Sequence, residues 1–297
     1  MKICYIDKRF GVASQTIIDQ ANSIIERYAA AGYTLTLRQL YYQFVASGLI
    51  ENTKKSYFRI ASVVNDSRLA GLIDWNAIED RTRFVRSLGH WHKPSEMVDA
   101  CIAQFRIDMW TNQAYRPEVW IEKDALVGVF EPVCNSFDVP LLSCRGYVSQ
   151  SEMWGAGQRI KSYCHRGQKA VVFHFGDHDP SGMDMTRDID ERLKMFVDDT
   201  TDGEWCGVTR VALTMKQIKE VEPPPNPTKL TDVRARGYIA KYGENSWELD
   251  ALDPTYLTKL VKESVSKLID LEKWKALEKV ILMGRKELRK AAKSLRE

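Results

Sequence analysis

Two patterns are missing from this chain of 297 residues. Its six cysteines, at positions 4, 101, 134, 144, 164 and 206, include no C-x-x-C pair. We therefore expect neither a zinc site nor a disulfide framework, and scattered cysteines are typical of a reducing compartment. No stretch approaches the ~20 apolar residues of a membrane helix, and the amino terminus lacks a signal-peptide core. We expect a soluble, cytoplasmic protein with no membrane partner.

A strong overall charge and a nucleotide-binding glycine motif are also missing. The net charge is only +3, so any surface for a polyanion has to be local. The stretch Gly155-Ala156-Gly157 lacks the context of a P-loop. Any step driven by ATP would therefore need a separate ATPase partner.

Carboxylates follow two apolar runs that are typical of buried strands. Asp177 and Asp179 come directly after Ala170–Phe175, and Glu122 comes directly after Glu118–Ile121. In open α/β folds, ligands gather where such strands end. Three hard oxygen ligands suit Mg²⁺, with Mn²⁺ as the other candidate. The alternative is a solvated turn in which Asp179 caps the next helix.

The amino-terminal region predicts three helices, over 14–30, 36–46 and 53–70, with Ser14 and Thr36 as caps for the first two. A short extended hairpin is expected next. Three helices followed by a hairpin is the order of a winged helix-turn-helix domain of the CAP-like kind, which we assign to residues 1–92.

Basic residues gather in this region, with nine Lys or Arg against five Asp or Glu between Arg38 and Lys93. Such side chains hold DNA through its phosphates, and a solvated helix face is the alternative. Tyr57, Phe58 and Trp75 are expected in the core. The candidate DNA-binding residues are Lys54, Lys55, Arg59 and Arg68 on the third helix, and Arg81 and Arg83 in the hairpin.

Strands and helices alternate after a helical connector over 93–114, which predicts a parallel α/β domain over 115–255. Residues 256–297 are expected to form a basic helical extension. The last part, from Lys259 onward, holds twelve basic and six acidic residues. The fold class is therefore α/β and multi-domain.

Tyr42 is a candidate nucleophile within the second helix. A phenol with a pKa of ~10 reacts poorly unless a cation or an activated water helps it. Arg38 lies four residues earlier on the same helical face. The alternative is that Tyr42 belongs to the rim of an ordinary apolar stripe.

These motifs carry a resemblance to a known family. A glutamate after one strand and Asp-x-Asp after another resemble the Toprim domain. The form Asp177-His178-Asp179-Pro180-Ser181-Gly182 is similar to the A subunit of topoisomerase VI and its meiotic double-strand-break relatives. The stretch from Arg38 to Tyr42 is similar to the Arg-x-x-Tyr-Tyr motif of the same family. Glu248–Leu252 is similar to the family's acidic Glu-x-x-Ala-Leu segment, whereas Tyr147-Val148 departs from its pattern.

The resemblance implies a transesterase. Tyr42 would attack double-stranded DNA and leave a 5′-phosphotyrosine, with Mg²⁺ held by Glu122, Asp177 and Asp179. It also implies a homodimer in which the tyrosine of one subunit meets the metal site of the other. A short stand-alone relative, prokaryotic or phage-encoded and nucleoid-associated, is expected.

Two other functions stay open. In one, Tyr42 is structural and the acidic site hydrolyses nucleic acid with a metal-activated water. In the other, the chain binds DNA without cutting it. His174 is expected in the core by strand alternation, whereas His178 lies between the two aspartates and is a candidate phosphate contact. The roles of Glu248 and Asp250 stay open as well.

Overall fold

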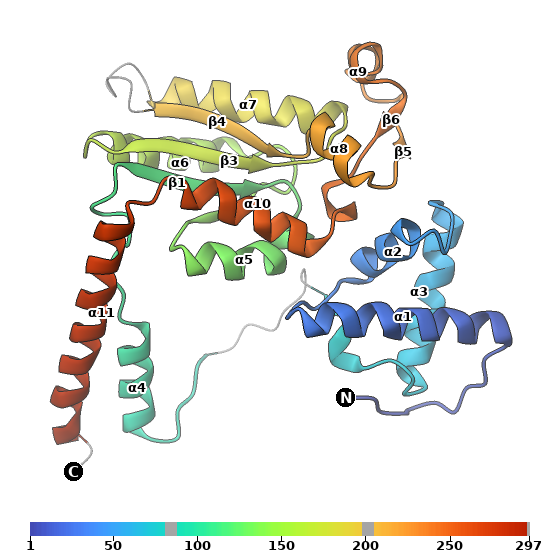
Figure 1. Cartoon of the computed structure of the whole chain (residues 1–297), viewed down its shortest axis with the longest axis horizontal. Coiled ribbons are helices and arrows are strands. Elements are labelled where there is room, and N and C mark those ends of the chain that lie inside the picture. Colours follow the sequence, from blue (N-terminus) through green and yellow to red (C-terminus); the bar gives the residue numbers. More distant parts are fainter. Residues whose placement is uncertain (81–87, 198–204, 296–297) are drawn as a thin grey trace.

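The computed structural model describes residues 1–80, 88–197 and 205–295. It has a helical part at the amino terminus and a larger part built on a parallel sheet (Figure 1). None of the helices in the described ranges is both long and apolar enough to cross a membrane. The coarse prediction of an α/β fold with a parallel sheet is confirmed.

Three helices make up the helical part: α1 (Val12–Ala30), α2 (Leu37–Ala46) and α3 (Lys54–Leu69). Thr36 caps α2 with a full capping box, in which Thr36 and Gln39 exchange side-chain and backbone hydrogen bonds. Thr53 caps α3. The cap predicted for α1 is wrong, because that helix begins after Gly11 and contains Ser14.

The predicted hairpin after α3 is only partly within the described residues. Before position 81 the chain forms a short 3₁₀ turn, Trp75–Ala77, and a single parallel bridge between Leu35 and Ile78. Positions Arg81 and Arg83 lie outside the described residues. The expectation that Phe58 belongs to the core is wrong, because its side chain is 66% exposed.

Four strands form the sheet in the order β2-β1-β3-β4, and each neighbouring pair is parallel. The strands are β1 (Tyr115–Ile121), β2 (Leu141–Ser143), β3 (Lys169–Phe175) and β4 (Trp205–Ala212). β1 and β3 pair along their whole length, from Tyr115 opposite Lys169 to Ile121 opposite Phe175. Because they are parallel and in register, the residues after both strands emerge side by side.

Helices cover both faces of the sheet (Figure 1). Val119 and Ile121 of β1 belong to the core shared with α5 and α10, whereas Trp120 between them belongs to the core shared with α6 and α7. This alternation follows from the two-residue repeat of a strand. The helices are α5 (Val127–Ser136), α6 (Gln150–Cys164), α7 (Pro180–Val197) and α10 (Pro254–Ser266).

The acidic motif itself begins helix α7. The helix begins at Pro180. The Asp179 carboxylate accepts a hydrogen bond from the Gly182 backbone N–H at 2.6 Å, which is a side-chain cap. Proline suits the first helical position because its φ is already helical.

The core of the sheet part continues beyond residue 255. Leu257, Val261 and Val265 of α10 are fully buried in the same apolar cluster as α5 and β1. Burying side chains of this kind stabilises a fold by about 1.5–3 kcal/mol each. α10 is therefore an integral layer of the sheet part.

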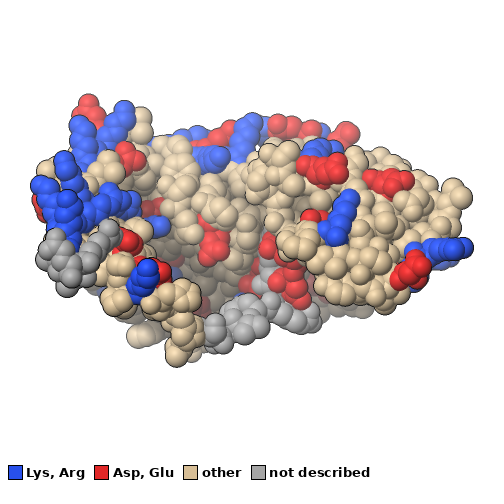
Figure 2. Space-filling view, turned by 90° about the horizontal axis from the view of Figure 1, so that it is seen from below, with Lys and Arg blue, Asp and Glu red and all other residues tan. Residues whose placement is uncertain are grey.

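The last long helix, α11 (Leu271–Ala291), lies beside the connector helix α4 (Pro94–Gln104). Arg285 donates a hydrogen bond to the Phe105 carbonyl at 3.1 Å. Lys and Arg side chains gather at this end of the molecule (Figure 2). Figure 1 places α11 at the opposite end from α2 and α3, so the basic carboxyl-terminal residues do not border the helical part.

Small elements after β4 connect the two parts. They are α8 (Met215–Val221), β5 (Asn226–Pro227), α9 (Ala235–Tyr242), β6 (Asn245–Ser246) and a 3₁₀ turn, Leu249–Ala251. The Asn52 side chain donates hydrogen bonds to the Pro225 carbonyl at 2.9 Å and to the Asn226 side chain at 2.8 Å. Tyr33 and Thr258 are hydrogen-bonded at 2.9 Å. These contacts fix the helical part against one edge of the sheet part.

Candidate active site

Glu122 and Asp177 lie next to each other at the carboxyl edge of the sheet. The Glu122 backbone N–H donates to the Phe175 carbonyl at 2.9 Å. The Glu122 side chain in turn accepts a hydrogen bond from the Asp177 backbone N–H at 2.8 Å. The structure thus brings together the two strand ends that the sequence analysis singled out.

Glycine is required where this loop closes on Glu122. A Cβ atom at Gly182 would lie 2.3 Å from the Asp177 carbonyl oxygen and 3.1 Å from Glu122 Oε2. A Cβ atom at Gly176 would lie 3.0 Å from the same Glu122 oxygen. Both glycines therefore make room for the carboxylate.

Asp177 is almost fully buried, at 6% exposed. One carboxylate oxygen accepts from the Leu249 backbone N–H at 2.7 Å, and the other lies 3.0 Å from the Lys123 ammonium. Burial raises the pKa of Asp177 to about 8, and the neighbouring charge of Glu122 adds to the rise while Lys123 opposes it. The group is held where negative charge is costly.

Lys123 is the cation at the centre of the acidic cluster. Its Nζ lies 3.0 Å from Asp177, 2.8 Å from Glu248 and 2.8 Å from Asp250. Burial works against the charged amine, but the charges of Asp250, Asp177 and Glu248 outweigh it and raise the Lys123 pKa. The sequence analysis did not single out Lys123, although its position directly after Glu122 was an available signal.

Arg210 on β4 binds the backbone of the segment 176–182, which carries Asp177 and Asp179. Its guanidinium donates to the carbonyls of Gly182 at 2.9 Å and Gly176 at 3.0 Å, and also to the carbonyl of Asp177. Burial lowers the pKa of Arg210. No sequence motif points to Arg210, because its partners are backbone atoms that a sequence pattern does not mark.

Arg38 and Tyr42 are neighbours on α2, as the spacing predicts. The Arg38 guanidinium lies 3.4 Å from the Tyr42 hydroxyl. It is also bound to the Asp250 carboxylate at 2.9 Å and to Glu248. Arg38 therefore connects the tyrosine to the acidic cluster of the sheet part.

The Tyr42 phenol is protonated at neutral pH in this arrangement. Tyr42 is 4% exposed. Burial raises its pKa to about 12, the charges of Asp250 and Glu248 add to this, and Arg38 opposes them. For Glu248 the balance is reversed, because burial is outweighed by Lys123 and Arg38, which lower its pKa to about 2.

A pocket of about 810 Å³ lies between α2, α3 and the loops of the sheet part. Tyr42 and Arg38 line it from the helical part, and Asp179 and Glu248 line it from the sheet part. A smaller hollow of about 360 Å³ is lined by Glu122 and again by Arg38. Arg38 thus borders both hollows, one on the tyrosine side and one on the side of Glu122.

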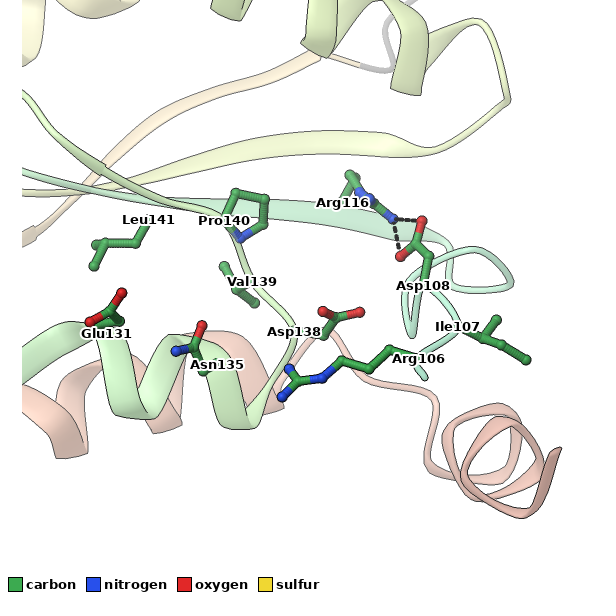
Figure 3. A pocket seen from close by; sticks show the side chains of 10 residues that line it. All are labelled: Arg106, Ile107, Asp108, Arg116, Glu131, Asn135, Asp138, Val139, Pro140 and Leu141. Carbon is green, nitrogen blue, oxygen red and sulfur yellow. Dashed lines mark hydrogen bonds and ion pairs between the residues drawn. The ribbon is translucent and has the colours of Figure 1, made fainter. Parts of the chain in front are cut away.

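A separate pocket lies near the opposite ends of the strands (Figure 3). It measures about 520 Å³, and Arg116 pairs there with Asp108 at 2.6 Å. Its lining includes neither Tyr42 nor any of the three predicted metal ligands. This pocket therefore has no part in the candidate site.

The two histidines of the acidic strand are both buried. His174 is 0% exposed and is bonded to Thr186 at 2.9 Å, so its predicted place in the core is confirmed. His178 is 2% exposed and is bonded through Nδ1 to the Tyr238 hydroxyl at 2.7 Å. His178 therefore faces the aromatic residues of the sheet part rather than the pocket.

The predicted DNA-binding residues differ in exposure. Lys54, Lys55 and Arg59 are exposed on α3. Arg68 instead donates to the Trp75 carbonyl at 2.9 Å and stacks over the Trp75 ring at 4.6 Å. Arg68 thus holds the end of α3 against the 3₁₀ turn, and its guanidinium is committed to that contact.

Glu122, Asp177 and Asp179 have the donor chemistry of a Mg²⁺ or Mn²⁺ site. Within residues 1–80, 88–197 and 205–295, no three His, Cys, Asp or Glu side chains converge as a ready metal cluster. Burial raises the pKa of Glu122, and the charge of Asp179 adds to the rise. A divalent cation would relieve this repulsion, so the donor set fits such a cation by chemistry and charge.

Comparison with known proteins gives no match. No family model matches the sequence, and no curated protein and no solved structure is significantly similar to it. The function of the site is therefore inferred from its own side chains.

Proposed function

We propose that the chain is a DNA-cleaving transesterase of the topoisomerase VI A-subunit kind, with a winged-helix part and a Toprim part. The observation that carries this proposal is the shared pocket. Tyr42 and Arg38 from α2 face the same space as Asp179 and Glu248 from the sheet part. A nucleophile and an acidic site that can hold a divalent cation have to meet in this way for phosphoryl transfer.

The reaction forms one bond and breaks one. The Tyr42 oxygen attacks a DNA phosphorus, the bond from phosphorus to the 3′-oxygen breaks, and the DNA keeps a 5′-phosphotyrosine. The phenol loses its proton, and the departing 3′-oxygen gains one. Because the pKa of Tyr42 is about 12, removal of this proton is a large part of the barrier.

A divalent cation fits the acidic side of this reaction. Glu122, Asp177 and Asp179 would hold it, and such a cation would supply stabilisation of negative charge on the phosphate. Arg38 lies beside the phenol oxygen at 3.4 Å and favours its ionised form. The charge of Lys123 offsets the negative charges of Asp177 and Asp250, which stabilises the buried cluster.

The remaining assignments concern DNA and partners. Lys54, Lys55 and Arg59 are exposed on α3, and we assign them to the DNA backbone. Cutting both strands takes two nucleophiles, and each chain carries one Tyr42, so the active form is a homodimer. In it each Tyr42 works with the acidic site of its own chain, which lines the same pocket, and not with that of the partner as the resemblance implied. A separate ATPase subunit would be needed only for strand passage.

A second function is favoured by one observation, the burial of Tyr42. A phenol that is 4% exposed with a pKa of about 12 is a poor nucleophile in this conformation. If Tyr42 is structural, the same acidic site would activate water and hydrolyse the phosphodiester. The products would then be free ends rather than protein-linked ends.

Plasmid cleavage separates the two functions. Supercoiled DNA is incubated with Mg²⁺, stopped with detergent and run with and without protease. For the transesterase, cut DNA stays protein-bound until protease is added, and cleavage is lost in Tyr42→Phe and Asp177→Asn. Tyr41→Phe is the matched control, because it removes the neighbouring hydroxyl, which bonds to Asn52 at 2.9 Å. Free ends that persist in Tyr42→Phe contradict the transesterase.

A further inference from the structure

Four aromatic rings lead from Tyr42 to the surface. Tyr42 contacts Tyr41, Tyr41 contacts Tyr57, and Tyr57 contacts Phe58, with ring centroids 5.3, 5.3 and 5.7 Å apart. All four line the pocket of about 810 Å³. The row therefore forms one continuous aromatic wall that starts at the candidate nucleophile.

The outer end of this wall is open to solvent. Phe58 is 66% exposed, whereas Tyr41 and Tyr42 are 4% exposed. Leaving a phenyl ring in water is unfavourable. An exposed ring at the rim of a pocket, backed edge-on by Tyr57, offers a flat face to whatever enters.

Two cations line the pocket together with this wall. Lys54 lies at the start of α3, and Lys229 follows the proline-rich loop. Both are exposed. The segments that carry them are in contact, because the Asn52 side chain donates hydrogen bonds to the Pro225 carbonyl and to the Asn226 side chain. An aromatic wall with exposed ammonium groups beside it suits the bases and phosphates of a nucleic acid strand.

We propose that this pocket binds an unpaired nucleotide of DNA next to the phosphate that is cut. The base stacks on Phe58 and Tyr57, and the flanking phosphates are held by Lys54 and Lys229. Stacking on aromatic side chains with a basic groove along the backbone is the general way in which proteins bind single strands. The assignment rests on the proposed cleavage function and narrows its substrate.

Duplex DNA does not meet the requirements of this pocket. In a continuous duplex, both faces of each base are covered by the neighbouring base pairs. No base therefore has a free face that could stack on the aromatic wall of the pocket. An unpaired base is free of its partner and costs least to turn outward. The preferred substrate is therefore a duplex with a gap, bulge or melted stretch at the cleavage site.

Binding is measured separately from cleavage. Wild-type protein in EDTA is titrated with three fluorescent oligonucleotides: a continuous duplex, the same duplex with a central two-nucleotide bulge, and a single strand. A 2-aminopurine in the bulge reports stacking by its quenching. We expect the bulged duplex to bind about tenfold more tightly than the continuous one. Phe58→Ala should lose this preference, since stacking is worth about 5- to 150-fold per base.

Two variants keep the test specific. Phe58→Trp preserves a stacking face and should retain the preference and the quenching. Trp154→Ala removes a 57% exposed aromatic from α6, outside the pocket lining, and should change nothing. Equal binding of bulged and continuous duplexes by the wild type, or an unchanged preference in Phe58→Ala, overturns the proposal.

The cleavage proposal fails in a different way. It fails if the wild type binds the bulged duplex through Phe58 but does not cut it when Mg²⁺ or Mn²⁺ is added. If the wild type cuts continuous and bulged duplexes equally, and Phe58→Ala cuts both as well, the cleavage function stands and the unpaired-nucleotide pocket is overturned.

Discussion

The guanidinium of Arg38 lies 2.9 Å from the carboxylate of Asp250. These residues are 212 positions apart, and their contact joins the helical part to the acidic cluster. Asp250 is 2% exposed and also binds Lys123 at 2.8 Å. The carboxylate of Asp250 thus links the helix that carries Tyr42 to the acidic residues of the sheet part.

Removing Arg38 should affect both stability and activity. Arg38→Ala leaves the buried Asp250 with Lys123 as its cation, and we expect a loss of about 1–3 kcal/mol in the free energy of unfolding. Cleavage should fall by roughly a hundredfold, since the cation beside the phenol is gone. Arg38→Lys should recover part of the stability but little of the activity, because an ammonium lacks the planar fork with which the guanidinium reaches the two carboxylates and the phenol together. Chemical denaturation and the plasmid assay measure the two effects, and full cleavage by Arg38→Ala would remove Arg38 from the mechanism.

Removing Lys123 should make the stability of the protein depend on Mg²⁺. In Lys123→Ala the acids Asp177, Glu248 and Asp250 lose their shared cation, which costs about 3–5 kcal/mol. Added Mg²⁺ should restore part of the melting temperature in this variant and much less in the wild type. Lys123→Arg keeps the charge and is the matched control. Thermal melts in Mg²⁺ and in EDTA check this, and identical melts for Lys123→Ala in both buffers would argue against cation binding at the acids.

The loop glycine should tolerate no side chain. Gly182→Ala places a Cβ atom 2.3 Å from the Asp177 carbonyl, so the loop and the start of α7 have to shift. We expect a loss of about 1–3 kcal/mol together with loss of cleavage. Gly155→Ala on α6 is the control, since nothing lies within 4 Å of its Cβ, and it should be neutral or stabilising by about 0.5–1 kcal/mol. Equal stability of the two variants would contradict the described packing.

His174 should make the protein sensitive to acid. Burial lowers the pKa of His174 to about 3 in the folded chain, and the charge of Arg210 adds to this. The unfolded chain binds a proton near pH 6.5 that the folded chain refuses, so stability falls as the pH drops from about 6.5 towards 3.

The size of this effect is measured as a difference between two proteins. His174→Phe should reduce the loss of unfolding free energy on acidification by up to ~1.4 kcal/mol per pH unit in that window. The comparison isolates His174, because the other buried groups contribute equally to both proteins. Urea denaturation at pH 5, 6 and 7.5 gives the slopes. His165→Gln, at the exposed end of α6, is the control, and equal slopes for His174→Phe and the wild type would contradict the buried neutral imidazole.

Local chemistry made much of the fold predictable. The cap of α2 was predicted correctly at Thr36, because a threonine side chain can satisfy a free N–H group of the next turn. The meeting of Glu122 and Asp177 was readable because parallel strands end at a common edge. The cap role of Asp179, given as an alternative in the sequence analysis, is confirmed by its hydrogen bond from the Gly182 backbone N–H.

Long-range pairing was not predictable. Helical spacing indicated that Arg38 and Tyr42 share a face, but it gave no sign that Glu248 and Asp250 would bind Arg38 across more than 200 residues. Phe58 was likewise expected in the core, because its hydrophobicity alone does not distinguish a buried ring from one at the rim of a pocket. Such contacts depend on how the two parts dock.

The most direct test of the central claim is to find the residue that becomes linked to DNA. Wild-type protein is incubated with DNA and Mg²⁺, denatured, and digested with nuclease and protease, and the modified peptide is sequenced by mass spectrometry. The account predicts a nucleotide joined through its 5′-phosphate to Tyr42. Cut DNA with no linked peptide, or a nucleotide on any other residue, would contradict it.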